Sequence, residues 1–191
     1  MKEFKRAFLV FIIMSALTGL AYPFGITLLC QLLFPEQANG SLVTPGGTVI
    51  GSTLVGQKFT RPEYFHGRPS ANDYDASNSG GTNFGPSNAK HLEEVGQRVR
   101  QARQSNGLDA GAAVPADLVL ASASGLDPHI SLDAALIQIP RVARARALPE
   151  ARVRTLVEKL TEPQFLGLTG QDRVNVLKLN RALDALTQER G

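Results

Sequence analysis

The sequence predicts a single N-terminal transmembrane helix followed by one small α/β (α+β) extracytoplasmic domain. Three observations lead to this fold class. Residues 7–34 carry no charged side chain, and a helix of about 20 apolar residues crosses a bilayer. Residues 35–191 alternate short β-branched stretches with segments of helical apolar spacing. Basic residues lie before the apolar stretch but not after it until Lys58, which places residues 35–191 outside the cytoplasm.

The apolar stretch is predicted to stay in the membrane as an anchor. The alternative is a cleaved signal peptide, whose apolar core is about 7–15 residues long and ends at a small-residue cleavage site. Residues 19–21 resemble such a site, but residues 22–34 beyond it are still apolar. The stretch is longer than a bilayer requires, which predicts a tilt or a bend, and Pro23 is the expected place for the bend.

The flanking charges predict the orientation of this helix. Lys2, Lys5 and Arg6 lie before it, so residues 1–6 are predicted to be cytoplasmic. The C-terminal domain is then periplasmic or extracellular, at the bacterial inner (plasma) membrane. The only cysteine, Cys30, lies within the helix, so the domain is expected to fold without disulfides.

Two pairs of small residues lie within the predicted membrane helix, Ser15 with Gly19 and Ala21 with Gly25. Small residues four positions apart let a second helix approach closely. The helix is therefore predicted to dock on a membrane partner. Exchanging Gly19 and Gly25 for Leu is expected to weaken recovery of that partner.

Residues 35–47 are predicted to be a linker, because Pro, Asn-Gly and Pro-Gly-Gly interrupt any regular element. The folded domain then covers residues 48–191. Residues 48–56 form a short stretch that is rich in β-branched side chains, which predicts a strand or a strand pair. Residues 60–88 are too rich in Pro, Gly, Asn and Ser for a long helix or strand. Aromatic side chains in this segment predict an ordered loop pinned by its rings; they are Tyr64, Phe65, Tyr74 and Phe84.

Helices in the rest of the domain are predicted from capping residues and from apolar spacing at i, i+3, i+4 and i+7. The first of them has only a thin apolar stripe, so most of its surface is expected to face water. The first predicted helix runs from Ser87 or Asn88 to about Ser105, and a short strand is predicted at 117–122. A second helix is predicted to begin at its cap Ser131 and to end at about Ile139, before Pro140. Two more helices are predicted at 148–162 and 174–188.

Two glycine-rich stretches resemble phosphate-binding motifs in part. Gly51 and Gly56 have the spacing of a P-loop, but Gln57 occupies the place of the lysine that reaches the phosphates, which excludes this motif. Residues 79–81, Ser-Gly-Gly, resemble a fragment of the signature by which ABC ATPases contact ATP. Backbone N–H groups in such a turn can hold an anion, and a tight turn that needs glycine is the alternative.

Ser124, Asp127 and His129 supply the residue types of a hydrolase triad within a few positions. A triad is assembled by geometry and not by closeness in sequence, and the G-x-S-x-G pattern of a nucleophile elbow is absent. Asp127-Pro128 favours a turn. No ligand spacing joins His129, Asp127 and His66, so no metal site is predicted. A membrane-anchored periplasmic hydrolase that uses Ser124 and His129 is the alternative function.

Residues 141–154 contain five arginines. Nucleic acid is excluded as their partner, because an exported domain does not meet it. A solvated helix face is the expectation, and contact with an acidic partner or with lipid headgroups is the alternative.

Six strings occur in order after the apolar helix: "GSTLVGQKF", "YFHGRPSANDYD", "SNSGGTNFGPSN", "VPADLVLASASGLDPHIS", "QIPRVARAR" and "VNVLKLNRALD". Together they cover almost the whole chain, and it resembles the C subunit of Kdp-type potassium-transporting P-type ATPases. The residues that carry the resemblance are Gly56, Gln57, Arg68, Pro69, Ser70, Asn83, Gly85, Pro86, Ser124, Gly125, Asp127, Pro128, His129 and Arg141.

The resemblance implies an accessory, non-catalytic subunit of a high-affinity K⁺ import complex. Its implied partners are a channel-like potassium-binding subunit, the P-type catalytic subunit and a small single-helix subunit. It also implies a role in assembly and a chaperone-like increase of the ATP affinity of the catalytic subunit. No cofactor is implied to bind tightly, although ATP is implied to act through the complex. Gln138 is the implied nucleotide contact, with Gln57 behind it and Ser79, Gly80 and Gly81 as further candidates.

ATP is cytoplasmic, whereas the flanking charges place the domain outside. The charges therefore favour a different expectation, in which the domain caps the outer face of the potassium-binding subunit. There it would hold the subunits together or shape the entrance for the ion. Four carboxylates are candidates for a field that attracts cations: Asp73, Asp75, Asp117 and Asp127.

Overall fold

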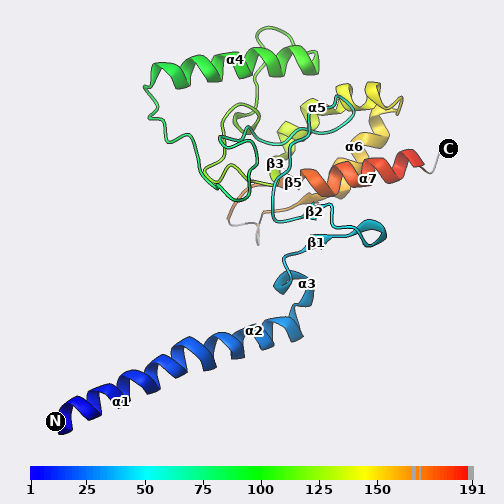
Figure 1. Ribbon diagram of the computed structural model, residues 1–191. Coiled ribbons are helices and arrows are strands. Elements are labelled where there is room, and N and C mark those ends of the chain that lie inside the picture. The colour runs from blue at the N-terminus through cyan, green and yellow to red at the C-terminus, as the bar shows by residue number, and fades with distance from the viewer. Residues whose placement is uncertain (165–166, 168, 189–191) are drawn as a thin grey trace. The chain divides into compact units, whose positions relative to one another are not determined.

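The computed structural model describes residues 1–164, 167 and 169–188. The chain divides into two compact units, residues 1–52 and residues 53–191 (Figure 1). The first unit holds the apolar helix and a small hairpin, and the second is the α/β domain.

The N-terminal unit begins with one long helical stretch, Lys2–Leu33, which is long and apolar enough to cross a membrane. It consists of α1 (Lys2–Ala16), a π-helical turn (Leu17–Ala21) and α2 (Tyr22–Leu33), and it buries no residue in this unit. Proline lacks a backbone N–H, and its ring clashes with the carbonyl group four residues earlier. A π-helical turn accommodates such a defect, so the irregularity lies directly before Pro23.

A two-stranded hairpin comes after the long helix. Helix α3 (Pro35–Ala38) leads into β1 (Leu42–Val43), a 3₁₀ turn at Pro45–Gly47 and β2 (Gly51–Ser52). Leu42 lies opposite Ser52 in this antiparallel pair. The prediction for 48–56 therefore holds only for two residues, and its partner strand lies inside the predicted linker. Gly46 and Gly47, both at positive φ, form the turn that brings the strands together.

The α/β domain contains a three-stranded antiparallel sheet in the order β3-β5-β4. Its strands are short: β3 is His129–Ser131, β4 is Thr161–Glu162 and β5 is Arg173–Asn175. On the central strand, Val174 lies opposite Ile130 on one side and Thr161 on the other. Both Ile130 and Val174 are buried, so the sheet contributes its apolar face to the core.

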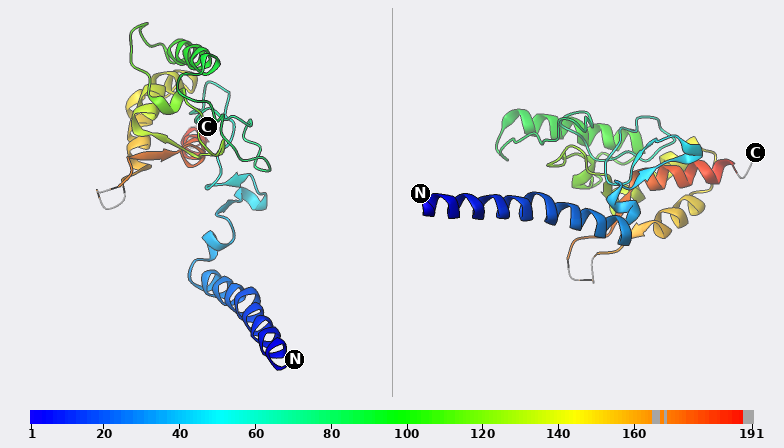
Figure 2. Two further views of the ribbon diagram at one scale, coloured as in Figure 1. Left: turned by 90° about the vertical axis from the view of Figure 1, so that its left-hand side faces the viewer. Right: turned by 60° about the horizontal axis from the view of Figure 1, so that its bottom comes forward.

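Three helices form the rest of the core, namely α5 (Leu132–Ala145), α6 (Glu150–Lys159) and α7 (Val176–Gln188). They contact one another in chain order, α5 with α6 and α6 with α7, close to the sheet (Figure 2). Their apolar faces meet in one cluster, whose largest fully buried helical side chains are Ile139, Val142, Val153, Val157, Leu179 and Leu183.

Helix α5 begins as predicted but does not end as predicted. The hydroxyl oxygen of Ser131 accepts a hydrogen bond from the backbone N–H of Ala134 (3.1 Å) and caps the helix. The helix continues through Pro140 to Ala145, so the prediction that Pro140 ends it is wrong. Proline inside a helix costs about 3 kcal/mol. Burial of Val142 and Ala143 after the proline offsets this cost.

Helix α4 (Ala89–Asn106) agrees closely with its prediction. Of the two predicted caps the structure selects Asn88, whose side chain accepts a hydrogen bond from the N–H of His91, and Gly107 ends the helix at φ 65°. None of its residues is buried. It contacts α5 and lies apart from α7 in both views of Figure 2.

The predicted strand at 117–122 is wrong, because this segment is a 3₁₀ turn (Ala116–Leu118) followed by irregular chain. Its backbone carbonyl groups bind arginine side chains instead of a neighbouring strand. Arg98 donates to the carbonyl oxygen of Val119 at 3.2 Å, and Arg68 donates to that of Ala121 at 3.4 Å. Two other predicted helices are shorter than expected, since residues 161–162 and 173–175 form β4 and β5.

The loop at 60–88 is ordered without helices or strands, as predicted. Phe65 is fully buried, and its backbone N–H and carbonyl groups both bind the side-chain amide of Asn180 in α7 (2.8 and 2.9 Å). The guanidinium groups of Arg61 and Arg146 both lie over the ring of Tyr64, 4.9 and 4.8 Å from its centre. The aromatic rings therefore attach this loop to the folded core.

Candidate functional site

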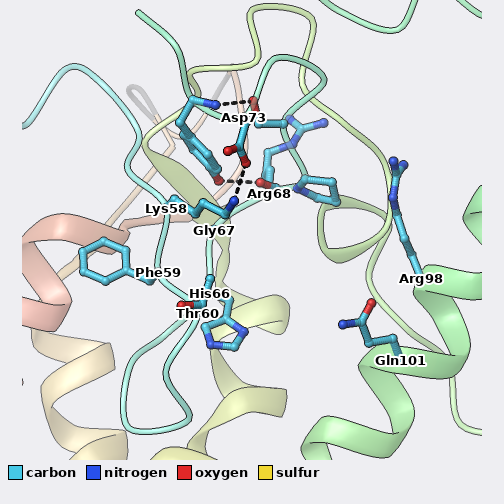
Figure 3. Close-up of a pocket in the computed structure, with 12 residues that line it drawn as sticks. Lys58, Phe59, Thr60, His66, Gly67, Arg68, Asp73, Arg98 and Gln101 are labelled. Atoms are coloured by element: carbon cyan, nitrogen blue, oxygen red, sulfur yellow. Dashed lines mark hydrogen bonds and ion pairs between the residues drawn. The ribbon is translucent and has the colours of Figure 1, made fainter.

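One hollow of the domain lies between residues 58–74 and helix α4 (Figure 3). Its volume is about 530 Å³. Lys58 and Arg68 lie on one side of it, and Arg98 and Gln101 project from α4 on the other. Three basic side chains therefore line this hollow, against one carboxylate, that of Asp73.

A second hollow of about 280 Å³ continues along α4. The two share five lining residues, His66, Gly67, Pro69, Arg98 and Gln101, so they form one continuous groove. We call it the α4 groove. Asn106 and Gln138 line its second part.

One wall of the α4 groove depends on Tyr74. Its hydroxyl donates to the carbonyl oxygen of Arg68, and its ring lies against Gly56 and Gly67. A Cβ atom at Gly67 would lie 2.8 Å from the tyrosine oxygen. A Cβ atom at Gly56 would lie 2.5 Å from the carbonyl oxygen of Asp127. Burial, with the nearby Asp127 charge, raises the pKa of Tyr74 to about 12, so the phenol stays neutral and remains a donor.

The backbone of this wall is strained. Asp73 and Tyr74 lie at φ 56° and 63°, a region that side chains other than glycine rarely adopt. The hydroxyl oxygen of Ser70 accepts a hydrogen bond from the N–H of Tyr74 (2.9 Å), and Lys58 pairs with the carboxylate of Asp73 (2.6 Å). Such strain persists where the surroundings hold it, and it is common at binding sites.

Behind the second part of the groove lies Arg141. Its guanidinium donates to the side-chain oxygens of Asn106 (3.0 Å) and Gln138 (2.7 Å) and to the carbonyl oxygens of Pro62 and Tyr64. Within residues 1–164, 167 and 169–188, no carboxylate pairs with this charge. Burial lowers the pKa of Arg141 to about 10, which leaves it charged. Burial and this charge lower the pKa of His66, so His66 is neutral at pH 7.

Gln138, the implied nucleotide contact, is 1% exposed. Its side-chain oxygen accepts from the N–H of His66 (2.8 Å) and from Arg141, and its amide nitrogen donates to the carbonyl oxygens of His66 and Ala134. The side chain is therefore bound on both ends within the domain. Nucleotide binding by Gln138 stays a prediction, and Gln57, the second candidate, is only partly buried and does not line the groove.

Residues 79–81 lie against the turn at 123–125. The N–H of Gly80 and the hydroxyl of Ser79 both donate to the carbonyl oxygen of Ser124 (2.9 and 3.0 Å). A Cβ atom at Gly81 would lie 3.1 Å from the carbonyl oxygen of Ala123. Two strings that are more than 40 residues apart in the sequence therefore form one packed unit, and anion binding at 79–81 stays a prediction.

Ser124 and His129 do not form a catalytic pair in the described part of the chain. The hydroxyl oxygen of Ser124 accepts from the N–H of Leu126 (3.1 Å), as in a serine turn. The ring of His129 lies instead between two carboxylates, 3.7 Å from Asp127 and 3.6 Å from Glu162. A triad needs the base within hydrogen-bond reach of the nucleophile, so the geometry does not favour the hydrolase alternative.

The His129 ring belongs to a charge network that connects separate elements. Arg68 pairs with Asp127 (3.1 Å), and Glu162 pairs with Lys178 (3.0 Å) and Arg173 (3.2 Å). Burial raises the pKa of Asp127, but hydrogen bonds from His129 and the Arg68 charge outweigh this and leave the pKa below its ordinary value. Burial likewise raises the pKa of Glu162, and bonds from Lys178 and Arg173 reverse the shift.

The four aspartates considered for a cation-attracting field all have donors within the domain. Asp73 pairs with Lys58 and Asp127 with Arg68. Asp117 accepts from the N–H and hydroxyl of Ser131, and Asp75 accepts from Ser77. Hydrogen bonds from Ser77 lower the pKa of Asp75. Each carboxylate therefore has a local structural role.

The other residues that carry the resemblance are mostly structural. Pro69 lines the groove, and Gly125, at φ 69°, packs against Asn72 and Gly80. Pro128 accepts a bond from the N–H of Val176 (2.9 Å), which joins β3 to α7. Asn83 is exposed and lies at φ 54°, and Gly85 and Pro86 lead into α4. In the apolar helix, Ser15, Gly19, Ala21 and Gly25 are exposed, and a Cβ atom at either glycine meets nothing within 4 Å.

Several residues of this site are not predicted by the sequence. Arg98 and Gln101 belong to a helix that is expected to face water. Their place in the groove is not predicted, because no local pattern shows that the loop at 58–74 lies opposite them. Asn180 does carry a signal: it is a polar residue beside the apolar positions Leu179 and Leu183, and a polar side chain at a core position needs a buried partner.

Comparison with known proteins gives one consistent result. Residues 4–185 match the family model described as "K+-transporting ATPase, c chain". Relatives named "Potassium-transporting ATPase KdpC subunit" include the three that follow. The protein of Polaromonas naphthalenivorans is 54% identical, with 97% of this chain and 96% of the relative covered. Those of Rhodopseudomonas palustris (strain BisB5) and Caldanaerobacter subterraneus subsp. tengcongensis are 48% and 50% identical, covering 99% and 95% of this chain and 100% and 94% of theirs.

The match spans both the apolar helix and the α/β domain, and the lengths agree from end to end. Identity of about one half over such coverage leaves no room for a different fold. The chain belongs to the KdpC family, the c chains of K⁺-transporting ATPases.

Proposed function

We propose that this chain is the accessory subunit of a potassium-transporting ATPase and acts by stabilising the assembled complex, without catalysis of its own. The observation that carries the proposal is the end-to-end match to relatives named as KdpC subunits of that ATPase. The proposed partners are a channel-like potassium-binding subunit, the P-type catalytic subunit and a small single-helix subunit of the same complex.

The proposed topology has the N-terminus in the cytoplasm and the α/β domain on the outer side of the bacterial inner membrane. It is supported by Lys2, Lys5 and Arg6 before the apolar helix and by the lack of basic residues from there to Lys58. The exposed small pairs Ser15–Gly19 and Ala21–Gly25 support contact between this helix and a partner helix. With this topology, the domain caps the outer face of the potassium-binding subunit.

A second candidate function is an increase in the ATP affinity of the catalytic subunit through nucleotide contact. The observation in its favour is that Gln138 lines the second part of the α4 groove, whose first part is lined by Lys58, Arg68 and Arg98. Against it, all hydrogen bonds that Gln138 makes are internal, and the proposed topology separates the groove from cytoplasmic ATP. Capping and assembly is therefore the function that we favour.

Co-purification tests this function. The other subunits of the complex are expressed with a tag on one of them, with and without this chain, and the recovery of the intact complex and its K⁺-stimulated ATP hydrolysis are measured. Assembly predicts that the complex falls apart when the chain is absent. The chain with Ser124→Ala should restore both recovery and hydrolysis. A complex that is recovered intact and hydrolyses ATP normally when this chain is absent would contradict the assembly function.

A further inference from the structure

We propose that the α4 groove is the docking site for an acidic polypeptide segment of another subunit, with a partner carboxylate bound between Arg98 and the 58–74 wall. This inference rests on the proposed function, because it assumes that the chain works inside a complex. It specifies the surface and the chemistry of the contact, which the proposed function leaves open.

The first support is the condition of helix α4 itself. It runs for 18 residues, and none of them is buried in this chain. Leu92 is 58% exposed. Helices in proteins gain most of their stability from packing an apolar face, and α4 has little such packing within its own domain. A partner that covers it would supply this packing.

The second support is the charge of the groove. Lys58, Arg68 and Arg98 line its larger part, and because Lys58 pairs with Asp73 and Arg68 with Asp127, Arg98 is the most weakly paired of the three cations. Arg98 has one weak carboxylate partner, Glu94 at 3.4 Å on the same helix. Arg141, behind the smaller part, pairs with no carboxylate among the described residues (1–164, 167 and 169–188) and is bound only by neutral oxygens. A buried charge without a counter-charge is costly, and an anion in the groove would lower that cost.

The third support is the shape of the site. The two parts of the groove, about 530 and 280 Å³, continue along α4 and share five lining residues. A single inorganic anion would fill only a small part of this space. An extended segment that carries a carboxylate would occupy the length of the groove and cover α4 at the same time. Basic lining and shape together therefore point to an acidic segment.

A zero-length carbodiimide crosslink tests the proposal. The reagent joins a lysine amine to a carboxylate in direct contact, with formation of an amide, and takes up the released water as a urea. Gln101 lines both parts of the groove, and Gln104 is exposed on the same helix outside it. The assembled complex is prepared with Gln101→Lys or with Gln104→Lys and treated in parallel. Native Lys58 is present in both and contributes the same background.

The proposal expects a covalent product between this chain and another subunit with Gln101→Lys, and little beyond background with Gln104→Lys. The product should map by mass spectrometry to an Asp or Glu of the partner. It should also fall as NaCl is raised from about 0.1 to about 1 M, because the Debye length shrinks from roughly 10 to 3 Å. Equal products from both variants, or none from either, would overturn the proposal. The proposal would also be overturned if ATP suppressed the crosslinked product and NaCl of equal ionic strength did not. That result would assign the groove to a phosphate ligand.

A second variant measures the contribution of charge. Arg98→Glu places a like charge opposite the partner carboxylate and should lower the recovery of the complex by about tenfold or more. Arg98→Lys should retain most of it. The thermal unfolding of each full-length variant in detergent serves as the folding control, since Arg98 also binds the carbonyl oxygen of Val119. If Arg98→Glu folds and assembles as well as Arg98→Lys, the docking proposal fails. A complex that assembles normally without this chain would instead contradict the proposed function.

Discussion

At the scale of single residues, glycine positions decide how closely the loop at 60–88 can pack. Gly56 is buried, and its missing side chain leaves room for both the ring of Tyr74 and the backbone of Asp127. A backbone carbonyl group cannot move aside as a flexible side chain can. The close approach of the two segments therefore depends on this glycine.

Gly56→Ala is expected to destabilise the protein by about 2–3 kcal/mol, because the new methyl group overlaps the carbonyl oxygen of Asp127. Urea unfolding of the full-length chain in detergent measures this change. Gly85→Ala is the matched control, since a Cβ atom there meets nothing within 4 Å, and it should stay within about 0.5 kcal/mol. Equal stability of the two variants would contradict the close contact between Gly56 and the backbone of Asp127.

Gln138 is the residue for which a structural and a nucleotide role make different predictions. Gln138→Leu leaves the N–H of His66 and one arm of Arg141 without an acceptor. It is expected to cost about 2–4 kcal/mol of folding stability. The same urea measurement applies, with Gln104→Leu on exposed α4 as the control. Wild-type stability of Gln138→Leu, together with a weaker effect of ATP on the complex, would favour the nucleotide role.

At the scale of elements, the charge network around His129 ties β3, β4 and α7 together through Asp127, Glu162 and Lys178. The pKa values of Asp127 and Glu162 are both lower in the folded state. A carboxyl group with a depressed pKa stabilises the fold above its unfolded-state pKa. That contribution is lost as pH falls through the folded-state pKa.

The stability that these two carboxylates contribute is therefore expected to be constant near neutral pH and to decline below about pH 5, where carboxyl groups of the unfolded chain begin to take up protons. Asp127→Asn should lower stability at pH 7 and make the decline shallower. Urea midpoints between about pH 7 and pH 3 measure both effects. Asp109→Asn is the control, because Asp109 is outside the network. An unchanged acid profile in Asp127→Asn would contradict the network.

The elements also show how far local patterns can predict the fold. Helices α4, α6 and α7 are predictable because capping residues and apolar spacing are local signals. The continuation of α5 through Pro140 depends on the burial of Val142 and Ala143, which no local signal reveals. The strand predicted at 117–122 is wrong for the same reason, because the contacts of this segment are not visible in any local signal. Its carbonyl groups bind Arg68 and Arg98, which are distant in sequence.

The candidate site is less predictable from the sequence than the fold. Arg68, Pro69, Asp127 and Gln138 stand out in the sequence and lie in or beside the α4 groove or the charge network. Their grouping could not be predicted, because it depends on the loop at 60–88 folding against α4 and the turn at 121–128. Ser124 and His129, close in sequence, are not joined by any hydrogen bond in the described part of the chain, whereas residues 79–81 and Ser124, far apart in sequence, are.

At the scale of the whole molecule, the proposed function requires an apolar helix that anchors a folded domain on the outer side of the membrane. The helix Lys2–Leu33 has the length and hydropathy for this, and the basic residues lie at its N-terminal end. Both the capping function and the acidic docking partner depend on this placement. A domain on the cytoplasmic side would meet ATP instead.

Cysteine labelling measures the placement directly. In a Cys30→Ser background, one variant carries Gln104→Cys on exposed α4 and the other carries Glu3→Cys before the apolar stretch. A membrane-impermeant maleimide is applied to intact cells and to inverted membrane vesicles. The proposed topology predicts that intact cells label position 104 and protect position 3, with the reverse in vesicles. Labelling of position 3 in intact cells, with position 104 reached only in inverted vesicles, would contradict it.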